Sequence, residues 1–173
     1  MTFFNYLYLF FNLLHKKIIG KKKYFSFSGV DIILKKIFSK QKKGFYIDVG
    51  CQHPIKNNNT YLLHKNGWSG INIDLDKDNI KLFKLARPKD ININIAVSNA
   101  IKEVNLYFYH KKSPINTLDE RTSNFQTAKV TSVKKVKTDT LNNIISKSIY
   151  KDSTFDLLSI DVEGHELEVL QGF

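Results

Sequence analysis

Cysteine is nearly absent from this 173-residue sequence, in which Cys51 is the only one. A single thiol excludes an intrachain disulfide and any zinc site built from several cysteines. The sequence therefore fits a reducing compartment, and we expect a cytoplasmic protein. Because no base accompanies Cys51 in the sequence, we expect this residue to be inert or to line a ligand loop, without acting as a nucleophile.

Acidic residues are scarce in one part of the chain. Residues 1–43 contain ten Lys and a single acid, Asp31, whereas residues 44–173 contain 17 basic and 15 acidic residues. Most of the net charge of +11 therefore belongs to the N-terminal segment. A nucleic-acid-binding domain carries its basic residues on its folded surface, so this distribution argues against nucleic acid as a partner. It predicts a basic helical segment over residues 1–43 and a separate domain over residues 44–173.

A long apolar run is also missing. The longest begins at Phe3 and ends at Leu14, which is shorter than the ~20 residues of a membrane-spanning helix. It lacks the preceding basic stretch and the cleavage site of a signal peptide. Lys16, Lys17 and the run at 21–23 follow it. Two interpretations are open: residues 3–23 contact an anionic membrane surface, or the helix packs on the domain and its lysines are solvated.

From residue 44 onward, short apolar runs alternate with helical patterns. Strands are predicted over 45–49, 70–74, 91–97, 104–109, 133–136 and 155–162. Helices are predicted over 30–38, 60–65, 77–85 and 141–147, and the polar stretch 113–127 is expected to be a loop. Strands separated by helices are typical of βαβ units, so we expect an α/β fold with a mostly parallel sheet.

A glycine-rich phosphate loop is absent after the first predicted strand. Dinucleotide binding requires Gly-x-Gly-x-x-Gly, but here Gly50 is followed by Cys51, Gln52, His53 and Pro54. Gly50 still permits a tight turn and the close approach of a ligand. Asp74 ends the next predicted strand, where a carboxylate can accept hydrogen bonds from ribose hydroxyls. This combination favours a nucleoside ligand without phosphate, such as S-adenosylmethionine.

A cluster of ionisable residues follows the last predicted strand. The strand ends in a run whose apolar residues are Leu157, Leu158, Ile160 and Val162. The ionisable residues at its end are Asp161, Glu163, His165 and Glu166. Ligands bind at the carboxyl edge of parallel sheets, and carboxylates placed there are costly unless they bind something. The same residues suit the start of a helix, with Glu163 and Glu166 in its first turn. Both interpretations are compatible, because one turn can begin a helix and line a site.

These motifs resemble the FkbM-type methyltransferase family over residues 44–173. The resemblance lies in Tyr46-Ile47-Asp48-Val49-Gly50-Cys51, His53-Pro54, residues 57–61, residues 67–74, Ala96-Val97-Ser98 and residues 161–172. It implies an S-adenosylmethionine-dependent O-methyltransferase with a Rossmann-like, three-layer class I fold. Its acceptor would be a hydroxyl of a sugar, a polysaccharide precursor or a similar small molecule.

The resemblance also implies which residues bind the cofactor. The residues concerned are Asp48, Gly50, Cys51, His53, Asp74, Asn94, Ala96 and Val97. The loop over 48–53 would surround the methionine part, Asp74 would hold the ribose, and residues 94–97 would lie near the adenine. His53 could equally shape its own turn.

Three catalytic candidates follow from the last motif: Asp161, Glu163 and His165. By the resemblance, Asp161 would face the methyl donor. The acceptor hydroxyl must lose a proton, and His165 has the most suitable unperturbed pKa, ~6.5, unless it is a solvent-facing helix residue. Asp161 and Glu163 are two apart, so in a strand they would share a face and could raise each other's pKa or hold a divalent cation. A cation needs more ligands than the sequence places here, so no metal is predicted.

The C-terminal end departs from the family pattern. Family domains usually continue with another helix-and-strand unit, so we expect a truncated domain that exposes a sheet edge and favours pairing with another chain. An inactive remnant is therefore one alternative, and a nucleic-acid methyltransferase is a weaker one. The acceptor loop is expected within residues 111–127, which carry no diagnostic motif.

Overall fold

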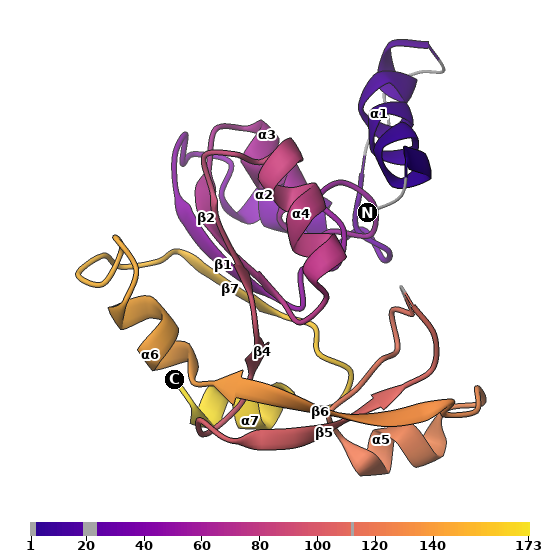
Figure 1. Ribbon diagram of the computed structural model, residues 1–173. Coiled ribbons are helices and arrows are strands. Elements are labelled where there is room, and N and C mark those ends of the chain that lie inside the picture. Colours follow the sequence, from indigo (N-terminus) through magenta and orange to yellow (C-terminus); the bar gives the residue numbers. More distant parts are fainter. Residues whose placement is uncertain (1–2, 19–23, 112) are drawn as a thin grey trace.

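The main sheet consists of four parallel strands (Figure 1). The computed structural model describes residues 3–18, 24–111 and 113–173. The strand order is β3 (Ile91–Asn94), β2 (Ser69–Asp74), β1 (Phe45–Val49) and β7 (Leu157–Ile160). Ile47 of β1 lies beside Ile71 of β2 and Leu158 of β7. These β-branched and apolar residues fit central strands that are covered on both faces.

Helices cover both faces of this sheet. One group is α2 (Val30–Ile37), α3 (Tyr61–Lys65) and α4 (Lys77–Ala86), and the other is α6 (Leu141–Ser146) and α7 (Glu166–Gln171) (Figure 1). Ile47 packs in one cluster with Leu141 of α6 and Val169 of α7. Its neighbour Tyr46 packs on the other face with Leu63 of α3. This alternation is the period-two pattern of a strand, and it confirms the mixed α/β fold with a mostly parallel sheet.

A second sheet contains β4 (Ala96–Val97), β6 (Ser132–Asp139) and β5 (Glu103–Phe108). The prediction of one strand over 91–97 is wrong, because the chain leaves the main sheet at Ile95. Asn94 donates to the carbonyl oxygens of Asp74 and Leu75, at 3.0 and 2.9 Å. Since β2 ends at Asp74, the next residues have no strand to pair with there, and they join β6 instead.

Two further predictions need correction. Within the expected loop 113–127, Glu120–Phe125 forms helix α5, whose N-cap Asp119 accepts hydrogen bonds from two backbone amides. The predicted strand 155–162 is shorter, and α7 begins only at Glu166. Glu163 therefore neither shares a strand face with Asp161 nor begins the helix. It lies in the connection with φ of 55°, a left-handed conformation.

The N-terminal segment begins with α1 (Phe3–Ile18), which extends the helix expected over residues 3–14. Leu9 of α1 is buried in a cluster with Phe25, Ile55 and Leu82, so α1 packs on the body of the molecule. Across residues 3–18, 24–111 and 113–173, we find no helix with the length and apolar character required to cross a bilayer.

Candidate active site

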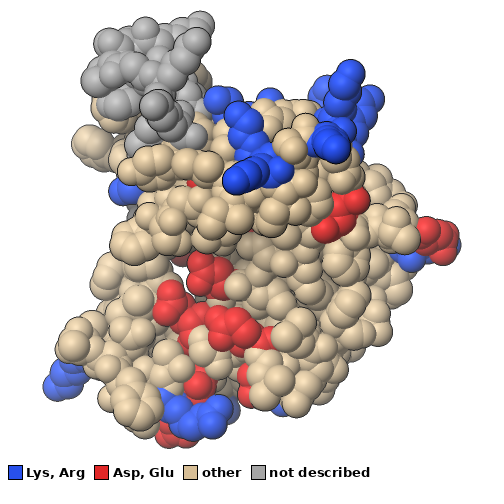
Figure 2. Space-filling model, turned by 180° about the vertical axis from the view of Figure 1, so that it is seen from behind, with Lys and Arg blue, Asp and Glu red and all other residues tan. Residues whose placement is uncertain are grey.

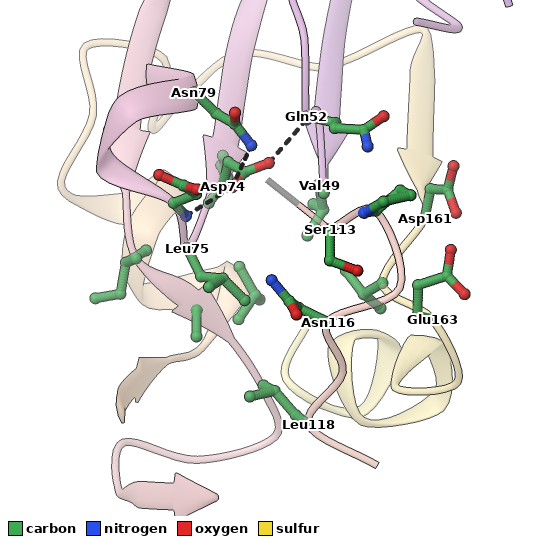
Figure 3. A pocket seen from close by; sticks show the side chains of 18 residues that line it. Val49, Gln52, Asp74, Leu75, Asn79, Ser113, Asn116, Leu118, Asp161 and Glu163 are labelled. Atoms are coloured by element: carbon green, nitrogen blue, oxygen red, sulfur yellow. Dashed lines mark hydrogen bonds between the residues drawn. The ribbon is translucent and has the colours of Figure 1, made fainter. Parts of the chain in front are cut away.

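A pocket opens where β1, β2 and β7 end, and acidic side chains surround a hollow on this side of the molecule (Figures 2 and 3). Its walls come from the strand ends, the start of α4 and the loop that precedes α5. The apolar lining residues are Val49, Ile73, Leu75, Ile95, Ala96, Val97, Pro114, Leu118 and Val162. The other lining residues are Gly50, Gln52, Asp74, Asp76, Asn79, Ser113, Asn116, Asp161 and Glu163.

The charge of the pocket is opposite to that of the chain. Four lining residues are carboxylic acids, namely Asp74, Asp76, Asp161 and Glu163, and none of the described lining residues is Lys, Arg or His. The whole chain nevertheless carries a net charge of +11. Such a pocket attracts a cationic ligand and repels a phosphate.

Asp74 is the most deeply placed of these acids and is 8% exposed. Its carboxylate accepts hydrogen bonds from the backbone amides of Gln52 and Asp76, at 2.8 and 2.7 Å, and from Nδ2 of Asn79, at 3.3 Å. Burial outweighs these bonds and raises the pKa of Asp74 to about 6. Two carboxylate oxygens offer about four acceptor sites, so Asp74 can still accept a bond from a ligand hydroxyl.

Gly50 joins two walls of the pocket. Its φ is +79°, and a Cβ atom at this position would lie 2.0 Å from the carbonyl oxygen of Asp161. The amide of Asp161 donates to Val49, at 2.9 Å, and the amide of Gly50 donates to Ile73, at 2.9 Å. The loop after β1 therefore touches the loop after β7, and only glycine permits this approach.

Asp161 and Glu163 lie together at one side of the pocket (Figure 3). Burial raises the pKa of Glu163, and the negative charges of Asp161 and Glu166 raise it further. Burial and Glu166 also raise the pKa of Asp161. Glu166 fixes the connection between them, because its Oε1 accepts from the amides of Val162 and Gly164, at 3.1 and 3.3 Å. A raised pKa makes each of these carboxylates a stronger proton acceptor than a carboxylate in water.

Gly50, Asp74, Ala96 and Val97 are the predicted cofactor residues that line this pocket; Asp48, Cys51, His53 and Asn94 lie outside its lining. Asp48 is buried and accepts from Oγ1 of Thr60, at 2.7 Å. Cys51 is buried beside Ile80 and Phe83, and burial raises the pKa of its thiol, which disfavours a nucleophilic thiolate. Nδ1 of His53 accepts from the amides of Ile55 and Lys56, at 3.1 and 3.0 Å, and so shapes its own turn.

Among the catalytic candidates, Asp161 and Glu163 line the pocket, whereas His165 does not. His165 is buried, and its Nε2 lies 3.0 Å from Oγ of Ser98. Its Nδ1 lies 3.6 Å from Glu168 on its own helix. Burial lowers the pKa of His165 below its ordinary value. The side chain expected to face solvent or the acceptor is thus held inside the fold.

The loop between β1 and α3 is held from within by Arg87, which is 0% exposed. Its guanidinium donates to the carbonyl oxygen of Pro54 and to Oδ1 of Asn58, both at 2.6 Å. It also donates to Oγ1 of Thr60, at 2.9 Å. Next to it, buried Asp90 accepts from the hydroxyl of Tyr46, at 2.5 Å. The cation therefore fixes the loop that carries Gln52.

Sequence reasoning missed this cluster and the lining residue Asn79. Gln52 and Asn116 lie within the loops predicted to contact the cofactor and the acceptor, but sequence reasoning did not single them out. The rarity of arginine could have indicated Arg87, because the sequence contains 25 Lys and only two Arg. A buried site that must donate to several oxygens in a plane requires a guanidinium. Among the described residues, no group of three or more His, Cys, Asp or Glu is arranged to hold a metal ion.

Comparison with known proteins gives one finding. A family model described as the methyltransferase FkbM domain matches residues 48–172. The match begins at the end of β1 and extends through α7, so it includes all the residues that line the pocket. No curated protein and no solved structure matches the chain.

Proposed function

Because the chain belongs to the FkbM methyltransferase domain family, it is a methyltransferase, and we propose that it methylates a hydroxyl group with S-adenosylmethionine. The proposed acceptor is a sugar, a polysaccharide precursor or a similar small molecule. The observation that carries this proposal is the acidic pocket at the carboxyl ends of β1, β2 and β7, which contrasts with the basic chain around it.

The lining of the pocket suits this cofactor. S-adenosylmethionine supplies a methyl group bonded to a positively charged sulfur. Asp74 would accept hydrogen bonds from the ribose hydroxyls, and the apolar residues at 95–97 would contact the adenine. Asp161 would face the sulfonium, whose charge a carboxylate stabilises. A phosphate-bearing cofactor would meet four carboxylic acids and no lining cation among the described residues.

The acceptor hydroxyl needs a base, and we assign this role to Glu163. Its carboxyl group lines the pocket beside Asp161, and its pKa is raised by burial and by that neighbour. The backbone carbonyl of Glu163 accepts from Oγ1 of Thr117, at 2.6 Å, which holds the residue in its left-handed conformation. His165 would support this connection from behind through its contact with Ser98.

Transfer of a labelled methyl group from S-adenosylmethionine tests the proposal. The acceptors would be monosaccharides, sugar nucleotides and short oligosaccharides, with an RNA and a protein as comparison. We expect methylation of a sugar hydroxyl, and a loss of about 10²–10⁴-fold in kcat for Glu163→Gln, with cofactor affinity changed less than about threefold. Glu120→Gln, on the exposed start of α5, is the matched control. Methylation of RNA or protein in place of sugars would contradict the proposal.

A further inference from the structure

Helix α1 turns a row of large apolar side chains toward solvent. Phe3, Phe4, Leu7 and Phe10 are all exposed, and the spacing from 3 to 7 to 10 places them on one helical face. Leu9 lies on the opposite face and is only 2% exposed. The helix is therefore fixed to the body by one side, and its aromatic side faces away from the body.

This exposure is concentrated in the N-terminal segment. Of the 20 large hydrophobic side chains that are exposed among the described residues, 12 lie within the first 37 residues. The others, such as Phe125 and Ile149, are distributed over the remaining chain. Isolated exposed apolar residues are ordinary, whereas a contiguous group marks an interaction surface.

The same segment also carries an unbalanced positive charge. Its only acidic residue, Asp31, is 0% exposed. The carboxylate of Asp31 accepts from the amide of Phe25, at 2.5 Å, and from Oγ of Ser26, at 2.9 Å. No acid of this segment therefore offsets its described, exposed lysines, which stand at positions 35, 36, 40, 42 and 43. Residues 44–173 are nearly neutral.

We propose that α1 and the exposed lysines of residues 35–43 bind the surface of a bilayer that contains anionic phospholipids. The aromatic face of α1 would enter the boundary between headgroups and acyl chains, and the lysines would contact the phosphates. At 16 residues, α1 is shorter than a helix that spans a bilayer, so it would lie in the interface. A nucleic acid would account for the lysines but leaves the row of phenylalanines without a role.

Sedimentation of the full chain with lipid vesicles tests this proposal. We expect binding to vesicles of phosphatidylcholine mixed with an equal amount of phosphatidylglycerol, weakened by added salt, and little binding to phosphatidylcholine alone. Phe3→Ser combined with Phe10→Ser should weaken binding at least about tenfold. Phe125→Ser combined with Ile149→Ser removes side chains elsewhere that are even more exposed, and should leave binding unchanged.

The contribution of charge has its own matched pair of variants. Lys35, Lys36 and Lys40, which are exposed, should weaken binding at least about tenfold when they are replaced together by Gln. The same replacement of Lys134, Lys135 and Lys137, which are exposed on β6, changes the net charge equally and should have little effect. Circular dichroism would establish that each variant is folded.

Four results would overturn the proposal. They are a folded protein that does not bind the anionic vesicles, equal binding to neutral vesicles, and equal losses in the control variants. The fourth is a loss with the lysine variant but none with the phenylalanine variant, which would indicate a site for a soluble polyanion such as RNA. Self-association that depends on Phe10, without vesicle binding, would assign the face of α1 to a second copy of the chain.

Discussion

Two groups of charged residues differ in how their charges are compensated. Behind the β1–α3 loop, Arg87 is enclosed with Asp90 and Asp48, and hydrogen bonds join them to Tyr46 and Thr60. In the pocket, Asp74 lies near the negative charge of Asp76, and Glu163 lies near that of Asp161. Among the described lining residues, no cation accompanies these acids. The first group is complete within the protein, whereas the second requires a cation from outside.

This difference separates stability from binding. A buried cation with all of its partners supports the fold, and removing it leaves uncompensated carboxylates. Carboxylates held without a cation destabilise the empty protein, as the raised pKa of Asp74 shows, and they release that cost when a positively charged ligand binds. Substitutions in the first group should therefore change unfolding, and substitutions in the second should change ligand affinity.

Replacing Arg87 should have the largest effect on stability. Arg87→Met leaves the carbonyl oxygen of Pro54 and Oδ1 of Asn58 without their buried donor. We expect the free energy of unfolding to fall by about 3–5 kcal/mol in urea denaturation. Arg121→Met, at a side chain that is 81% exposed, should change it by less than about 0.5 kcal/mol. Similar values for the two variants would contradict the role assigned to the Arg87 cluster.

Gly50→Ala should disrupt the contact between the loop after β1 and the loop after β7. The added Cβ meets the carbonyl oxygen of Asp161, so the loops after β1 and β7 must separate. We expect the free energy of unfolding to fall by about 2–4 kcal/mol, and we expect S-adenosylmethionine to bind much more weakly. Gly29→Ala is the matched control, because Gly29 has a similar φ of +77° but no atom within 4 Å of the added Cβ. Gly29→Ala should lower the free energy of unfolding by about 1–2 kcal/mol through backbone strain alone, and it should leave the affinity for S-adenosylmethionine unchanged. Equal effects of the two variants on cofactor binding would contradict this account.

The pH dependence of the free energy of unfolding measures the contribution of Asp74. Its pKa is about 6 in the folded protein and ~3.9 when unfolded, so the folded state holds this proton more tightly. Stability from this proton is present below the unfolded pKa and is lost as the pH rises through about 6. The wild type should therefore lose about 1–3 kcal/mol relative to Asp74→Asn between about pH 4 and pH 7. A difference that stays constant with pH would show that Asp74 is not the titrating group.

Ser98→Ala should have the smallest effect on stability. It tests whether His165 supports the fold or takes part in proton transfer. Ser98 is buried and lies 3.0 Å from Nε2 of His165. If His165 only positions the connection to α7, the variant should lose about 1 kcal/mol of stability and keep its pH profile and kcat. Ser146→Ala, at an exposed hydroxyl of α6, is the control. A fall in kcat with a displaced pH profile would instead place His165 in the proton transfer.

The strands of the main sheet were predictable, because the spacing of their apolar residues and the turn residues at their ends are local features of the sequence. The prediction for residues 45–49 matches β1, and those for 70–74 and 77–85 agree with β2 and α4 to within one residue at either end. Gly50, Asp74, Asp161 and Glu163 were predictable as pocket residues, because parallel strands end at the same edge. Asp119 and Glu120 also contained a local signal for α5, a helix cap followed by an acid.

The direction of individual side chains was not predictable. Asp48 ends β1 as Asp74 ends β2, yet Asp48 points to Thr60 and Asp74 lines the pocket. His165 follows Glu163 by two residues, yet a left-handed turn at Glu163 and Gly164 carries it into the fold. Arg87 contacts Pro54 across 33 positions of sequence. These outcomes depend on contacts between distant segments, which spacing within one motif does not specify.

Titration of the full chain with S-adenosylmethionine tests the central claim, that the uncompensated carboxylates form a site for a cationic nucleoside. The account predicts saturable binding at about pH 8, at least tenfold weaker binding in Asp74→Asn, and unchanged binding in the exposed control Asp152→Asn. Binding by the wild type should weaken at about pH 5, because Asp74 is then protonated. No saturable binding by the folded protein, or tighter binding of ATP than of S-adenosylmethionine, would contradict the account.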